Sequence, residues 1–111
     1  MLETNISHKK GILIIQATGR LDGLTSKKFL EVAEDEISKD SNNVVLNLER
    51  LDYISSEGLR SVLTAAKNAK SLSGKLVLCG PTAGVKEVLD ISGFGQMLGV
   101  FDTEDEALDA M

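Results

Sequence analysis

The sequence predicts an α/β fold: a single domain with a mixed, mostly parallel sheet of four or five strands and about four helices. Three observations support this. The 111 residues fit one domain spanning residues 1–111. Short apolar runs alternate with amphipathic segments, as expected when helices connect parallel strands. The first two strand-like runs are joined only by a short turn, so that pair should be antiparallel.

The N-terminal half supplies two strands and a helix. Residues 2–7 fit a short edge strand, and "HKKG" fits a turn. "GILIIQATGRL" is apolar and rich in β-branched residues, which is typical of a strand covered on both faces. The segment 25–38 is the predicted helix, with Thr25 or Ser26 as its N-cap. Its apolar residues recur at helical spacing: Phe29, Leu30, Ala33 and Ile37.

The C-terminal half repeats this alternation. "VVLNL" and "KLVLCG" are predicted as buried strands, and "MLGVF" as a last strand. A helix begins near Gly58 and ends at "SLSG", and a second one opens at Pro81-Thr82. Thr103 and Glu106 fit a capping box for a terminal acidic helix. The sequence therefore predicts strands and helices in turn up to the C-terminus.

Charge and composition narrow the function classes. The net charge is −5, and five of the 17 acids lie in residues 102–111 without a base. No basic stripe is present, so we expect no nucleic-acid partner. The longest apolar run, "ILII", is far too short to span a bilayer, and the N-terminus has no apolar core of the length that a signal peptide needs. With a single cysteine as well, we expect a cytoplasmic protein without membrane insertion.

Candidate sites lie at the carboxyl ends of the predicted parallel strands, where α/β folds place ligands. Three loops fit: Arg20–Thr25, Glu49–Gly58 and Gly80–Gly84. The second contains Ser55-Ser56 and leads into a helix N-terminus, which favours anions. From the residues alone, two interpretations remain: one serine is only an N-cap, or the pair has a chemical role such as carrying phosphate.

Catalytic and cofactor chemistry find little support. The only histidine, His8, falls in a turn predicted at the opposite end of the second strand from Ser56. Cys79 lies in an apolar strand, and no ligand spacing suggests a metal. "GPTAG" lacks the lysine of a phosphate loop. We expect no catalytic residues, no metal and no cofactor. Phe94 and Met97, near turns, fit either the core or an apolar partner contact.

Several segments together resemble the STAS domain family, specifically its stand-alone anti-sigma factor antagonists. "TGRLDGLTS" resembles the family segment after the second strand, and "VVLNLERLDYISSEGLRSVL" its signature of strand, serine loop, Gly-Leu and helix. "KLVLCGPTAGVKEVLDISGF" resembles the later strand and helix, and "FDTEDEAL" the closing ones. The likeness runs almost end to end.

The resemblance implies a regulator without a reaction of its own. Family members bind a GHKL-type serine kinase that doubles as an anti-sigma factor. The kinase phosphorylates a serine of the loop and thereby releases the antagonist, and a phosphatase restores it. Aligning Gly58-Leu59 on the family motif Asp-Ser-Ser/Thr-Gly-Leu puts the phosphoacceptor on Ser56, with Ser55 as runner-up. Ser55 then replaces the family's acid, and Glu57 replaces its second hydroxyl.

The same resemblance implies a switch loop that contacts the partner. Its members in this chain are Asp22, Thr25, Asn47, Asp52, Glu57 and Gly58. Two other functions remain as alternatives. One is an accessory STAS subunit of a larger assembly, such as a lipid-transport ABC machine, and the other is a small-ligand or nucleotide-binding module.

Overall fold

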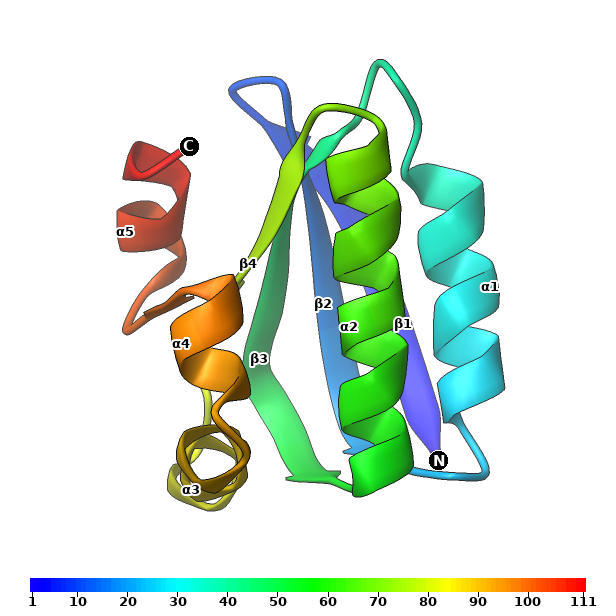
Figure 1. Ribbon diagram of the computed structural model, residues 1–111, viewed down its shortest axis with the longest axis vertical. Helices are drawn as coiled ribbons and strands as arrows, with labels where there is room; N and C mark the ends of the chain where they lie inside the picture. The colour runs from blue at the N-terminus through cyan, green and yellow to red at the C-terminus, as the bar shows by residue number, and fades with distance from the viewer.

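Five strands form one mixed sheet in the order β1-β2-β3-β4-β5, in a computed structural model that describes residues 1–111 (Figure 1). β1 and β2 are antiparallel, and every later pair is parallel. The strands are β1 (Leu2–Lys9), β2 (Ile12–Leu21), β3 (Asn43–Ile54), β4 (Lys75–Cys79) and β5 (Val100–Phe101). The helices are α1 (Ser26–Glu36), α2 (Ser56–Ser71), α3 (Ala83–Ser92), α4 (Phe94–Leu98) and α5 (Glu104–Asp109). The predicted α/β class, the antiparallel first pair and the mixed sheet are confirmed.

Both faces of the sheet are covered, because the strands bury alternate side chains in two separate clusters. Leu13 and Ile15 of β2 belong to a cluster of 22 buried residues beneath α1, α2 and α3. Ile12 and Ile14 belong to a cluster of seven on the other face, where α5 contributes Ala107 and Leu108. This explains the unbroken apolar run of β2, since such a strand meets core on either side.

The strand β3 is longer than the sequence predicts. The apolar run was expected to end near Leu48, with a loop over Glu49–Gly58, but β3 continues to Ile54. Two irregularities in its pairing with β2, at Gln16/Thr18 and Gly19/Arg20, change the side-chain alternation. Leu51 and Ile54 are buried but lie three residues apart. A strand is predicted from apolar residues at every second position, so this spacing does not indicate one.

The C-terminal segment also departs from expectation. Phe94–Leu98 forms a one-turn helix, α4, where a turn and the start of a strand were predicted. The last strand is therefore only Val100–Phe101. Gly93 and Gly99 flank α4 with φ of 79° and 81°, conformations that glycine adopts without steric cost. The final count is five helices, one more than the four expected.

The terminal helix α5, which the sequence predicts, also makes polar contacts with the rest of the domain. Thr103 Oγ1 accepts a hydrogen bond from Glu106 N at 3.1 Å, which is one half of the expected capping box. Lys9 Nζ of β1 donates to Glu104 Oε2 at 2.8 Å. Hydrogen bonding to Lys9, and then to Asn47, lowers the pKa of Glu104 despite partial desolvation. These contacts hold the first turn of α5 against the sheet.

Candidate functional site

The serine pair marks the boundary between β3 and α2. Ser55 alone separates the two elements, since β3 ends at Ile54 and α2 begins at Ser56. Ser55 is the N-cap: its Oγ accepts a hydrogen bond from Gly58 N at 3.1 Å, and its own N–H donates to Leu21 O at 3.0 Å. Ser56 is exposed, and its hydroxyl has no protein partner. One serine is thus a cap and the other is a free hydroxyl in the first turn of a helix.

Gly58 allows α2 to start directly against the end of β2. A Cβ at Gly58 would lie 2.3 Å from the carbonyl oxygen of Leu21 and 3.0 Å from Ile54 Cγ1. No side chain fits at that distance, so glycine is required for the close approach of helix and strand. This approach fixes the serines beside the β2–α1 loop.

The β2–α1 loop is a tightly bonded turn organised by Asp22. Asp22 Oδ1 accepts from Leu24 N at 3.0 Å and from Thr25 N at 3.2 Å. Thr25 Oγ1 accepts from Asp22 N and donates to Arg20 O at 2.8 Å, so its side chain braces the turn rather than capping α1. Desolvation would raise the pKa of Asp22, but hydrogen bonds from Leu24 and Thr25 and the charge of Arg20 lower it on balance. The turn is therefore held with an ionised carboxylate.

Two side chains that sequence reasoning did not single out project from this region. Leu24 lies at the tip of the turn with 94% of its surface exposed. Tyr53, 41% exposed, stacks beneath the Arg20 guanidinium at 4.3 Å from the ring centroid. Arg20 Nε also lies 3.6 Å from Asp22 Oδ2. The sequence offered a signal for each: an apolar residue inside a turn, and the only tyrosine of the chain.

The two other acids of the expected switch loop are exposed. The Glu57 side chain lies over Gly23, where a Cβ would be 3.2 Å from Glu57 Oε2. The Glu57 side chain therefore lies against the Asp22 turn. Asp52 lies in β3, three residues before Ser55, and its carboxylate makes no hydrogen bond or ion pair. The structure thus gathers Asp22, Thr25 and Glu57 around the serines, with Asp52 further along the strand.

Asn47 does not join this group, contrary to its expected position at a strand end. It lies in the interior of β3, paired with Gln16 and Cys79, and is only 3% exposed. Its Nδ2 donates to Glu104 Oε1 at 3.0 Å, and its Oδ1 accepts from Glu49 N. Because β3 runs on to Ile54, Asn47 is a buried support for α5 and not a loop residue.

The other reactive side chains lie away from the serines. His8 is next to the last residue of β1 and pairs with Leu13, so it lies at the opposite end of β2 from Leu21. Cys79 is buried, and desolvation with the Glu104 and Glu49 carboxylates raises its pKa to about 12. No group of three or more His, Cys, Asp or Glu side chains is placed to hold a metal. No helix is long and apolar enough to cross a membrane.

The family model of the STAS domain matches residues 3–107 of this chain. The chain belongs to the STAS domain family. It is 38% identical over 97 residues to BtrV of Bordetella bronchiseptica, assigned as an anti-sigma factor antagonist, covering 87% of this chain and 84% of BtrV. It is 29% identical over 108 residues to the anti-sigma F factor antagonist of Paenibacillus polymyxa, covering 96% and 92% of the two chains.

Solved structures share this STAS fold. An anti-sigma factor antagonist from Mycobacterium paratuberculosis superposes with a TM-score of 0.89 at 15% identity, covering 99% of this chain and 93% of that one. Unphosphorylated SpoIIAA, an anti-sigma factor antagonist, gives a TM-score of 0.80 at 22% identity, with 97% and 95% covered. The phosphorylated form of Bacillus SpoIIAA gives 0.74 at 22% identity, with 97% and 98% covered. The expected STAS-like fold is confirmed.

Proposed function

We propose that this STAS domain is an anti-sigma factor antagonist switched by phosphorylation of Ser56. In this function the unphosphorylated protein binds and sequesters an anti-sigma factor that is also a serine kinase of the GHKL type. Phosphate on Ser56 releases the complex, and a phosphatase restores it. The observation that carries the proposal is the exposed, unbonded Ser56 hydroxyl in the first turn of α2. Relatives assigned as anti-sigma factor antagonists support the class of partner.

The geometry favours Ser56 over Ser55 as the phosphoacceptor. The Ser55 hydroxyl is half-buried and already accepts the hydrogen bond from Gly58 N. Phosphorylating it would remove the helix cap, whereas the Ser56 hydroxyl has no structural task. A phosphate on Ser56 also lies at the positive end of the α2 dipole, which favours a negative charge. The domain can therefore accept the modification without unfolding.

The partner surface in this proposal centres on the Asp22 turn and the start of α2. Leu24 is an apolar side chain held out in solvent by a turn with three hydrogen bonds, so little conformational entropy is lost when it is buried. Tyr53 and Arg20 are of the residue types that most often dominate binding energy. We expect the partner to supply an apolar pocket for Leu24 and an acidic group for Arg20.

The protein acts through binding in this proposal, with no reaction of its own. The only histidine, His8, lies at the opposite end of β2 from the serines. The Asp22 carboxylate already accepts hydrogen bonds from Leu24 N and Thr25 N. A serine-reactive fluorophosphonate probe should therefore label neither serine. Stoichiometric labelling of either one would contradict the proposal. We expect the complex to form in the cytoplasm, where the kinase has ATP.

Intact mass after incubation with the host's candidate anti-sigma kinases and ATP tests the proposal. One added phosphate is expected on the unaltered chain and on Ser55→Ala, and none on Ser56→Ala. Peptide mass spectrometry then locates the phosphate. Phosphate retained by Ser56→Ala would move the site to Ser55. If no kinase binds or modifies the protein, while a pull-down recovers an ATPase subunit, the accessory-subunit function would replace this proposal.

Leu24→Asp separates the surface from the switch. Leu24 is 94% exposed, so the free energy of unfolding should change by less than about 0.5 kcal/mol. Affinity for the unphosphorylated complex should fall about 100-fold, as is common when a buried anchor is lost. Ile91→Asp, at a position 79% exposed on α3, is the matched control and should bind normally. Equal affinities of the two variants would place the interface elsewhere.

A further inference from the structure

One basic side chain lies in the first turns of α2, close to the serines. Arg60 follows Ser56 by four residues on the same helix. Residues at this spacing share one face, with Cβ atoms about 5–6 Å apart. Helical side chains lean toward the N-terminus of their helix, so the Arg60 side chain covers the turn that starts at Ser56. Both residues are exposed, and a group attached to Ser56 therefore lies within reach of the Arg60 guanidinium.

The Arg60 guanidinium has no partner within the domain. It takes part in none of the three ion pairs, and its side chain donates no hydrogen bond. The other arginine near the serines, Arg20, is already paired, since its Nε lies 3.6 Å from Asp22 Oδ2. The next basic residue of α2 is Lys67, about three turns beyond Ser56. Arg60 is therefore the basic group that is free to meet a new negative charge on Ser56.

The only acid of α2 is directed away from Arg60. Glu57 lies three residues before Arg60, a spacing that also permits an ion pair. Its carboxylate instead lies against the Asp22 turn, where a Cβ on Gly23 would be 3.2 Å from Glu57 Oε2. The face of α2 that carries Ser56 and Arg60 is thus left with an unpaired cation beside a free hydroxyl.

From this arrangement we propose that Arg60 binds the phosphate of Ser56 and is thereby withdrawn from the partner surface. The inference rests on the proposed phosphorylation of Ser56. In the unmodified protein the Arg60 guanidinium faces solvent and contacts an acidic group of the partner. In the phosphorylated protein two phosphate oxygens accept N–H groups of Arg60 in a bidentate pair. The modification therefore adds negative charge to the surface and removes its positive charge in one step.

The second pKa of the phosphate reports this ion pair directly. Two cations, Arg60 and Arg20, favour the dianion and lower the pKa of the phosphate. Three carboxylates, of Glu57, Asp22 and Asp52, disfavour the dianion and raise it. All the other groups stay in place when Arg60 alone is replaced, so the change in the phosphate pKa on that replacement isolates the contribution of Arg60.

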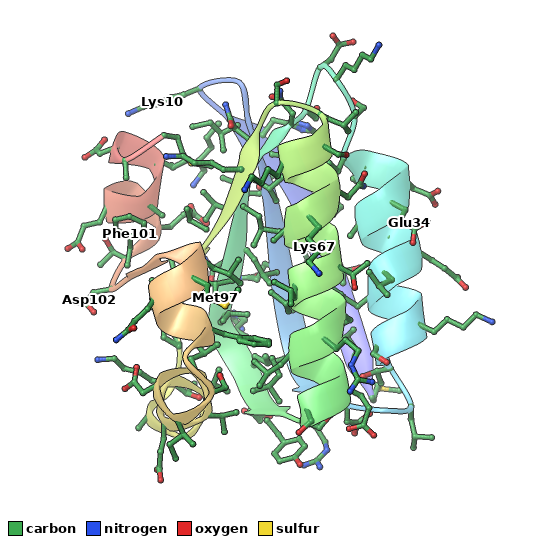
Figure 2. The ribbon with its side chains drawn as sticks, in the orientation of Figure 1. Lys10, Glu34, Lys67, Met97, Phe101 and Asp102 are labelled. Carbon is green, nitrogen blue, oxygen red and sulfur yellow. The ribbon has the colours of Figure 1, made fainter.

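Phosphorus nuclear magnetic resonance measures this pKa in the full chain, with phosphoserine incorporated at position 56 during translation so that no kinase is needed. Arg60→Gln should raise the phosphate pKa by about 0.2–0.5 units, as expected for an exposed ion pair at this helical spacing. Arg60→Lys should raise it by less, because the ammonium keeps the charge but loses the bidentate geometry. Lys67, in the middle of α2 (Figure 2), provides the matched control. Lys67→Gln removes the same charge from the same face about 16 Å from Ser56, and should change the pKa by less than about 0.1 unit.

Calorimetry with the partner kinase tests the withdrawal of Arg60. Arg60→Gln should weaken the unmodified complex about tenfold, because a charge that faces a partner acid is lost. The same substitution in the phosphorylated protein should change the affinity less than about twofold, because the phosphate already holds the guanidinium. Equal losses in both forms would contradict the withdrawal, since Arg60 would then contact the partner regardless of the phosphate.

The ion pair and the proposed switch can fail separately. Melting curves show whether each variant is folded, and little change is expected because Arg60 and Lys67 are exposed. A phosphate pKa shift confined to Arg60→Gln, in a protein that no kinase binds or modifies, would support the ion pair and refute the switch. An unchanged phosphate pKa in a folded Arg60→Gln, or an equal shift in Lys67→Gln, would overturn the ion pair even if a kinase phosphorylates Ser56.

Discussion

At the scale of single residues, two adjacent serines contribute differently to the stability of the fold. Ser55→Ala removes the hydrogen bond to Gly58 N and should cost about 1 kcal/mol of unfolding free energy. Ser56→Ala removes no bond and should change it by less than about 0.5 kcal/mol. Urea denaturation of both variants measures the difference, with Ser55→Asp as a variant that keeps a capping oxygen. Equal stabilities of Ser55→Ala and Ser56→Ala would contradict the capping assignment.

A second residue-scale prediction concerns two glycines near helix N-termini. A Cβ at Gly58 would lie 2.3 Å from Leu21 O, whereas nothing lies within 4 Å of one at Gly84. Gly58→Ala must push α2 away from β2 and should cost about 1–3 kcal/mol. Gly84→Ala should instead stabilise by about 0.4–1 kcal/mol, through the unfolded chain. Thermal melting compares them, and a Gly58→Ala protein as stable as Gly84→Ala would mean that α2 can shift freely.

At the scale of elements, sequence reasoning succeeded where local patterns decide the outcome. The helices α1 and α2 follow their apolar spacing, and β2 follows its unbroken apolar run. The prediction was wrong where a strand depends on irregular pairing with its neighbour, as at the end of β3. The residues "ERLDY" alternate poorly, and only their register with β2 reveals them as strand. A five-residue helix between two glycines, α4, has too few turns to show a period.

The candidate site was predictable to the same extent. Ser55, Ser56, Glu57 and the Asp22 turn follow from short motifs read in order along the chain. Asn47 could not be placed, because its partner Glu104 lies 57 residues away and no local pattern announces that hydrogen bond. Leu24 and Tyr53 were missed for a different reason. Apolar side chains are expected in the core, and only the structure shows that these two are exposed.

An element-scale prediction concerns the docking of α5. Glu104, whose pKa is lowered by Lys9 and Asn47, stabilises the fold above 4.5, the ordinary pKa of its carboxyl. This contribution disappears as the pH falls through the lower folded pKa. Glu104→Gln should therefore cost about 1 kcal/mol near pH 7, and the difference should be smaller near pH 3, below the ordinary pKa of the carboxyl. Urea midpoints at both pH values measure it.

Glu106→Gln is the matched control for α5. Glu106 is exposed in the same first turn and forms no ion pair, so the same charge change there should have little effect at either pH. A Glu104→Gln deficit that persists unchanged at low pH would show that packing, rather than the carboxylate, holds α5. At high pH the same ion pair is limited by Lys9. Its hydrogen bond to Glu104 raises the pKa of Lys9 above the ordinary value of 10.5, and the ion pair is lost when the pH rises through this raised pKa.

At the scale of the whole molecule, the residues that stabilise the fold and those proposed to bind the partner lie in different places. The core lies between the sheet and its helices, while the serines, the Asp22 turn and Leu24 lie at the carboxyl edge of β2 and β3. A charge added to Ser56 therefore faces solvent and a partner, not the core. A switch at such an edge can change affinity by several kcal/mol without drawing on the free energy of folding.

Ser56→Asp tests this separation, provided that Ser56 is the switch. The domain should melt within a few degrees of the unaltered protein, because Ser55 still caps α2 and a carboxylate in the first turn gains about 0.3–1 kcal/mol from the dipole. Repulsion from Glu57 and Asp22 offsets part of this gain. Facing one partner acid at roughly 6 Å, an added charge costs about 2–3 kcal/mol at an effective dielectric near 20.

Phosphate, with about 1.5–2 charges, should thus lower affinity for the kinase at least 100-fold. Ser56→Asp, with one charge in a different shape, should show a smaller loss of about 10-fold or more. Ser56→Ala should bind normally and resist release by ATP. Calorimetry of each variant with the kinase measures these affinities, and melting curves monitor the fold. Unchanged affinity of a properly folded Ser56→Asp would put the serine outside the interface, because a charge buried against the partner cannot be energetically silent.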